Sequence, residues 1–97
     1  MLQEFLSENP NDAFARYGLA LEYSKAGDPA AALTEFNKLL ELHPDYVPAY
    51  QMAAQTLLGA GREQEGKSML HRGIACAKRS GNQHAQLEME TMLAELG

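Results

Sequence analysis

A period of thirty-four residues is the feature that most constrains how this chain can fold. Leu6 and Pro10 near the start are followed thirty-four residues later by Leu40 and Pro44. Elsewhere, apolar residues that stand thirty-four positions apart are more often similar in size than identical. The identical pairs of the two later copies are Ala15/Ala49, Ala20/Ala54, Ala26/Ala60 and Gly27/Gly61. A repeat of this length corresponds to one supersecondary unit, which buries its apolar face by stacking on its neighbours.

The composition and the apolar spacing both predict helices within each copy. Ala, Leu, Glu, Gln and Met are frequent, and Val47 and Ile74 are the only Val and Ile, so helix is favoured over sheet. Asp28 followed by Pro29 is typical of a helix start, and the next apolar residues recur at helical spacing. Breaks that contain Gly, Pro, Asn or Asp separate segments of helical length at residues 9–12, 27–29, 43–48, 59–61 and 80–82. The sequence therefore predicts an all-α chain.

Each full unit carries a recurring set of small, aromatic and apolar residues at fixed places. In residues 13–46 these are Leu19, Ala20, Tyr23, Gly27, Ala32, Phe36 and Pro44, and in residues 47–80 they are Tyr50, Ala53, Ala54, Leu57, Gly61, Gly66, Leu70 and Gly73. The pattern and the period resemble the tetratricopeptide repeat (TPR) family over nearly the whole chain. Arg16 departs from the pattern where the family prefers a large aromatic residue. Lys78 stands in place of a proline, which should let its helix run further.

The resemblance implies an α-α superhelix, a TPR solenoid, in a single domain spanning residues 1–97. Its parts would be a partial helix over 1–10, full repeats over 13–46 and 47–80, and a capping helix over 82–96. The partial helix is either the end of a preceding repeat in a longer protein or a native cap, and both interpretations stay open. Two units are few for a stable stack, so a homodimer through the open repeat ends is a further hypothesis.

Gly66 and Gly73 fall inside a predicted helix, where each glycine costs about 1 kcal/mol of helix stability relative to alanine. One interpretation is that they let two helices approach closely where they cross. The alternative is that they mark a poorly packed helix.

Charge, cysteine content and motifs argue against several other functions. The net charge of −5 and the pI of about 5.0 oppose nucleic-acid binding, which depends on attraction to phosphate. No run of about eighteen apolar residues is present and Cys76 is the only cysteine, so we expect a cytoplasmic protein that does not enter a membrane. His43, His71 and His84 have no metal-ligand spacing, and no phosphate-binding loop is found. The sequence therefore predicts no metal, no cofactor and no enzymatic activity.

One predicted helix holds a cluster of basic residues, which are Arg62, Lys67, Arg72, Lys78 and Arg79. They could form an anion-binding stripe. A solvated face is favoured instead, because at helical spacing the cluster divides between two separate stripes.

In the TPR family, the first helix of each hairpin lines a concave groove in which ligands lie as extended or helical peptides. By position, the resemblance assigns to this groove Phe14, Tyr17, Leu21, Ser24, Lys25, Gln51, Met52, Gln55, Leu58, Gln86 and Met89. Such a mixture of rings, aliphatic and thioether groups and amides suits an apolar peptide segment or helix of a protein partner.

The chain is thus expected to be a protein-interaction scaffold. The alternative is an oligomerisation or regulatory segment of a larger polypeptide, which could be an enzyme. A different arrangement of the groove also stays open, in which Phe14, Tyr17 and Leu21 pack under the N-terminal helix or under a second copy.

Overall fold

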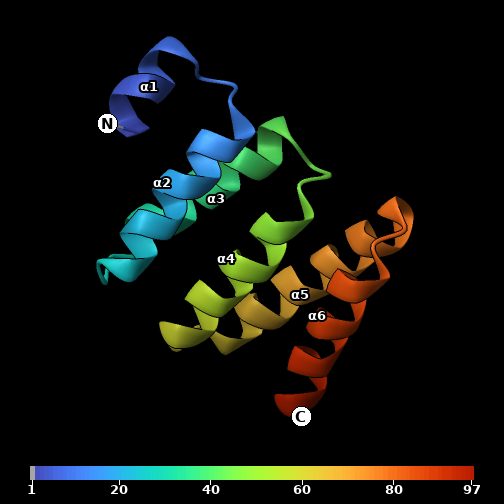
Figure 1. Ribbon diagram of the computed structural model, residues 1–97. Helices are drawn as coiled ribbons and strands as arrows, with labels where there is room; N and C mark the ends of the chain where they lie inside the picture. The colour runs from blue at the N-terminus through green and yellow to red at the C-terminus, as the bar shows by residue number, and fades with distance from the viewer. Residues whose placement is uncertain (1) are drawn as a thin grey trace.

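The computed structural model describes residues 2–97, and within them it has six helices and no strand (Figure 1). The helices are α1 (Leu2–Glu8), α2 (Ala13–Lys25), α3 (Pro29–Leu42), α4 (Val47–Gly59), α5 (Glu63–Ser80) and α6 (Gln83–Glu95). The prediction of an all-α chain is therefore confirmed. The hairpins α2–α3 and α4–α5 follow one another along the molecule, with α1 at one end and α6 at the other (Figure 1).

Side-chain caps and glycine turns explain where several helices begin and end. Asp12, Asp28 and Asn82 each accept a hydrogen bond from the backbone N–H three residues further on, at 2.8, 3.1 and 3.0 Å. Gly27 and Gly61 follow α2 and α4 with positive φ values of 80° and 77°, a conformation that glycine adopts without strain. The two hairpins therefore turn in the same way at equivalent places of the repeat.

Removing the cap of the last helix should weaken the C-terminal end of the stack. In an Asn82→Ala variant the N–H of Ala85 loses its acceptor, so we expect the free energy of unfolding to fall by about 1 kcal/mol. Urea unfolding followed by circular dichroism measures this change. Asn82→Asp keeps an acceptor at the helix start and should stay close to the natural chain; equal losses in both variants would contradict the capping role.

The main core lies between the two helices of each hairpin and between the hairpins. Phe36, Leu39 and Leu70 have no exposed surface. Ala20 and Ala54 are equally buried at equivalent places of α2 and α4. Small side chains at these positions let the backbones of paired helices approach closely. The other members of this core that are fully buried are Ala32, Ala49, Ala53, Cys76, Ala77 and Met89.

A second, smaller core holds α1 onto α2. Leu6 of α1 is buried with Ala15 and Leu19 of α2, and Tyr23 packs at the edge of this cluster. The side-chain amide of Gln3 donates a hydrogen bond to the hydroxyl of Tyr23. The first helix is therefore attached to the stack through one face only.

The glycines inside α5 are points of close helix approach. A Cβ atom at Gly73 would lie 2.5 Å from the sulfur of Met89 and 2.7 Å from Cβ of Tyr50. At Gly66 it would lie 2.7 Å from Cδ2 of Leu58. Both distances are shorter than side-chain packing allows, so at Gly73 α5 approaches α4 and α6 more closely than alanine would permit, and at Gly66 alanine would require Leu58 to move. This geometry supports close crossing and contradicts a poorly packed helix.

The two departures from the family pattern each have a structural consequence. Arg16 donates from Nη1 to Glu35 Oε1 at 2.6 Å and from Nη2 to the carbonyl of Pro10 at 3.0 Å. It therefore joins α2 both to α3 and to the loop after α1. Lys78 does not interrupt its helix, and α5 continues to Ser80, as the missing proline predicts.

Candidate functional site

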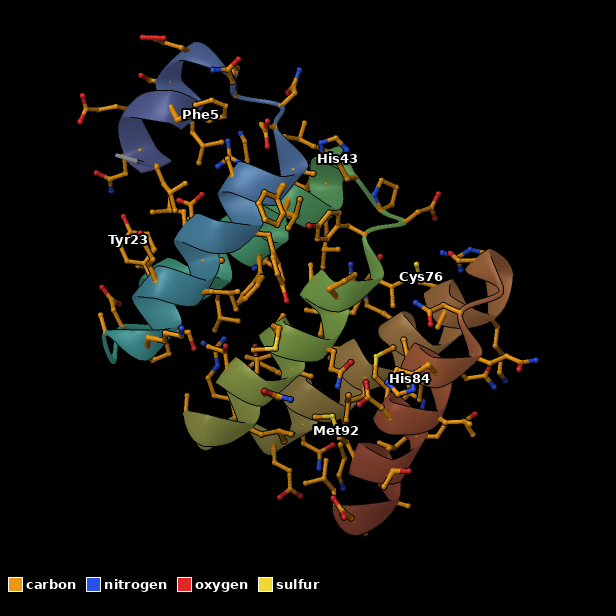
Figure 2. All side chains as sticks on the ribbon, in the orientation of Figure 1. Phe5, Tyr23, His43, Cys76, His84 and Met92 are labelled. Carbon is orange, nitrogen blue, oxygen red and sulfur yellow. The ribbon has the colours of Figure 1, made fainter. Side chains whose placement is uncertain are left out.

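The first helices of the successive hairpins, α2 and α4, lie next to each other, and α4 also contacts α6. Together they form the face to which the sequence assigns the groove. On this face a hollow of about 430 Å³ lies between α4 and α6. We call it the groove hollow; it is lined by Gln51 and Gln55 of α4 and by His84, Leu87, Glu88, Thr91 and Met92 of α6. Figure 2 labels His84 and Met92, which mark the α6 side of this hollow.

The groove hollow combines apolar surface with groups that can bind a peptide backbone. Leu87 is 62% exposed, so it offers apolar surface to a ligand on this face. Gln51 Nε2 lies 3.9 Å from the sulfur of Met92, which places an amide beside a deformable apolar group. Glu88 adds a carboxylate, 3.5 Å from Nε2 of His84. An apolar side chain with neighbouring amide groups fits this set of residues.

Among the predicted groove residues, Gln51 and Gln55 come together at the groove hollow. Lys25 is exposed at the end of α2. Leu21 and Met52 are half-buried, because each packs against the main core on one side. Gln86 is also half-buried, and its amide donates to Glu90 at 3.2 Å within α6.

Two further predicted residues connect elements of the fold. The ring of Tyr17 lies 6.3 Å from the ring of Phe36 and 5.4 Å from that of Tyr46, measured between centroids. Burial, and then the neighbouring Tyr46, raise the pKa of the Tyr17 hydroxyl above its usual value of 10.0. The hydroxyl of Ser24 lies 3.2 Å from that of Thr56 and links α2 to α4. Much of the Tyr17 ring is therefore core packing, under α3 and not under α1.

Three predicted groove residues lie elsewhere, and their assignment to the groove is corrected here. Met89 has no exposed surface, because its side chain fills the space beside Gly73. Leu58 lies over Gly66 and belongs to the contact between α4 and α5. Phe14 is exposed, but it lines a different hollow between α1 and α2.

The sequence interpretation missed Leu87. A uniform shift of thirty-four residues pairs Leu87 with the buried Ala53, which hides it. In the structure the helix caps Asp12, Tyr46 and Asn82 lie thirty-four and thirty-six residues apart, so Leu87 takes the place that Gln51 has in α4, five residues after the cap. Leu87 is therefore exposed on the groove side of α6.

Most of the basic residues in α5 and at its N-cap already have partners. Arg62 makes two contacts of 2.7 Å with the carboxylate of Glu65, which raise the pKa of the guanidinium and lower that of the carboxylate. The guanidinium of Arg72 lies 5.5 Å from the centre of the Tyr50 ring. The remaining pairs are Lys67 with Glu63 at 3.5 Å and Arg79 with Asp45 at 3.8 Å. These pairings support the interpretation of this surface as a solvated face.

Residues 2–97 contain no group of three or more His, Cys, Asp or Glu side chains placed to hold a metal ion. Cys76 is buried, with its sulfur 3.5 Å from the carbonyl oxygen of Pro44. In the same part of the chain, no helix has the length and apolar character needed to cross a membrane.

Paired helices that stack side by side, with small residues at their crossings, define an α-α helical repeat protein. A family model described as tetratricopeptide repeat matches residues 23–88, which is more than half of the chain. The chain belongs to the tetratricopeptide repeat family.

Relatives and solved structures agree with this assignment. The chain is 26% identical to a TPR repeat-containing protein of Pseudomonas aeruginosa over 95 residues, covering 98% of this chain and 90% of the relative. It is 36% identical over 73 residues to an uncharacterized protein of Methanocaldococcus jannaschii, covering 75% and 85% of the two chains. The solution structure of a TPR domain protein from Salinibacter ruber superposes with a TM-score of 0.83 at 30% identity, covering 89% of this chain and 87% of that one. TPR domains serve in general as non-catalytic scaffolds for protein–protein interaction.

Proposed function

We propose that this chain binds a peptide segment or a helix of a protein partner on the face formed by α2, α4 and α6. The observation that carries the proposal is the groove hollow, where the exposed side chain of Leu87 lies beside the amides of Gln51 and Gln55. An apolar anchor in a pocket with hydrogen-bonding groups around it is a common basis of peptide recognition. The scaffold itself is proposed to have no catalytic role.

The charge around the groove hollow supports a preference among peptides. Glu88 lines the hollow, and no lysine or arginine is among the lining residues. A peptide with an apolar residue next to Lys or Arg would therefore be favoured over an acidic one. The net charge of −5 likewise supports a protein partner over a nucleic acid or an anionic membrane surface.

Selection from a random peptide library, followed by fluorescence anisotropy, tests this proposal. The selected peptides should carry an apolar residue beside a basic one. We expect Leu87→Glu to weaken their binding about tenfold or more, because it places a charge where the apolar anchor must lie. The melting temperature should be unchanged within error, since Leu87 is mostly exposed.

Leu42→Glu is a matched control, because Leu42 is also an exposed leucine but lies at the end of α3, outside the groove hollow. Its affinity for the selected peptides should equal that of the natural chain. Peptides that are insensitive to Leu87→Glu, or the failure of any peptide to bind, would rule out this site.

A further inference from the structure

A second apolar hollow lies at the N-terminal end of the stack, between α1 and α2. Its volume is about 410 Å³, and we call it the N-terminal hollow; it is lined by Leu2, Phe5, Asp12, Phe14, Ala15 and Gly18. Phe5 is 45% exposed and Phe14 is 78% exposed. Figure 2 labels Phe5 on α1, at the opposite end of the molecule from Met92. Two aromatic side chains at the edge of one hollow form an apolar surface with no partner in the described chain.

The internal repeat shows which kind of element fills an equivalent hollow. A shift of thirty-four residues takes Leu2, Phe5 and Ala15 to Phe36, Leu39 and Ala49. Those three residues have no exposed surface. They lie in α3 and α4, and α2 contacts both of these helices.

In the equivalent hollow of the first repeat, α2 also contributes an aromatic side chain. The ring of Tyr17 of α2 packs against Phe36 and against Tyr46, which is the counterpart of Asp12. At the N-terminal end, no helix of the described chain occupies the place that α2 takes one repeat later. The N-terminal hollow therefore has the form of a binding site for one amphipathic helix.

The charged residues around the N-terminal hollow indicate which side chains a bound helix would carry. Residues 2–15 contain three acidic residues and no lysine or arginine. Asp12 lines the hollow, and Glu8 lies one turn from Phe5 on α1. The nearest basic side chain, Arg16, is already bound by Glu35 and by the carbonyl of Pro10. A helix with basic residues beside its apolar stripe would be attracted to this end.

The last helix of a second copy fits this site poorly. Glu90 of α6 stands eight residues after the cap Asn82, as the fully buried Ala54 and Ala20 stand eight residues after the caps Tyr46 and Asp12. A second copy would bring the Glu90 carboxylate into such a crossing, close to the acidic residues around the N-terminal hollow. Burial of an unpaired charge is costly, so this occupant is disfavoured.

We propose that the N-terminal hollow docks an amphipathic helix of a partner protein, with lysine or arginine next to its apolar stripe. This surface is separate from the groove hollow and does not depend on peptide binding there. The partner helix would complete a hairpin with α1, so that Phe5 becomes buried as Leu39 is in the first repeat, while the ring of Phe14 would contact the helix from the edge of the hollow.

Two synthetic peptides that match the helix of the equivalent site can test the proposal. The first has the sequence of residues 13–26, and the second is the same peptide with Glu22→Lys, which makes it more basic. Binding to the isotope-labelled full chain is followed by NMR, with affinities from fluorescence anisotropy. We expect both peptides to shift the amide signals of Phe5, Phe14 and Gly18. The basic peptide should bind about threefold tighter, and its advantage should fade as salt is raised.

Variants of the full chain separate this site from the groove hollow. Phe14→Ser should weaken binding of the basic peptide roughly fivefold without changing the melting temperature, because the ring is mostly exposed. Leu87→Glu, at the other end of the stack, should leave the affinity unchanged. Signal shifts confined to α4 and α6, or no saturable binding, would overturn the proposal. A dimer that dissociates in Phe14→Ser, detected by light scattering, would also overturn it, because a second copy would then be the occupant.

Discussion

Phe36→Ala is expected to lower the free energy of unfolding by about 3 to 5 kcal/mol. Phe36 has no exposed surface, and its ring lies 6.3 Å from that of Tyr17. Truncation removes the apolar contacts of the ring and leaves a cavity where α2 and α3 meet. A small domain has only roughly 5 to 15 kcal/mol of stability in total, so this loss consumes a large share of it. The melting temperature should fall by at least about 12 °C.

Leu42→Ala provides the control on the same helix. Leu42 is 41% exposed, so its truncation should change the free energy of unfolding by about 0.5 kcal/mol or less. Urea denaturation of the two variants side by side measures both changes. Similar losses in the two would mean that α3 is stabilised by helix propensity and not by the burial of Phe36.

The fold was predictable because the features that determine it are local and repeated. Asp28 before Pro29 predicted a helix start, and Asp28 does cap α3. The glycines at 27 and 61 predicted turns, and both adopt positive φ. The period of thirty-four residues then predicted how the hairpins follow one another, since a helix pair can bury its apolar face only against the next pair.

The site was predictable only in part, because helical spacing shows which face a residue is on but not what covers that face. Gln51 and Gln55, which the family pattern assigns to the groove, line the groove hollow. Met89 follows Gln55 by thirty-four residues, yet it is buried. The caps Tyr46 and Asn82 are thirty-six residues apart, so Met89 stands at the place of the buried Ala53, where it fills the space beside Gly73. The length of the preceding helix sets this shift, and the pattern within α6 does not show it.

Leu87 and Phe14 illustrate the same difficulty at the ends of the stack. Each is apolar, and a uniform period of thirty-four residues would place Leu87 with the buried Leu19. The longer interval between the caps of α4 and α6 turns Leu87 to the groove side instead, and spacing within a single unit does not contain that information. Phe14 is exposed because α1 covers only part of the face of α2 in the described chain.

Substitution of the glycines of α4 and α5 by alanine should give opposite effects at different positions. At Gly73 a new Cβ would lie 2.7 Å from Cβ of Tyr50, an atom held next to the backbone of α4, and 2.5 Å from the sulfur of Met89. Overpacking of this kind costs about 1 to 3 kcal/mol, against a gain of at most about 1 kcal/mol from helix propensity. We therefore expect Gly73→Ala to destabilise the protein.

The loss of stability in Gly73→Ala can be compared with that of the matched substitutions Gly66→Ala and Gly59→Ala. At Gly66 the new Cβ would meet the flexible end of Leu58, which can move aside, and at Gly59 no atom lies within 4 Å. Stability should therefore rank in the order Gly59→Ala, Gly66→Ala, Gly73→Ala, with the first equal to or slightly above the natural chain. Chemical denaturation of the three variants tests the order. If Gly73→Ala were as stable as Gly59→Ala, α5 would not approach α4 and α6 as closely as described, and the burial of Met89 would lose its explanation.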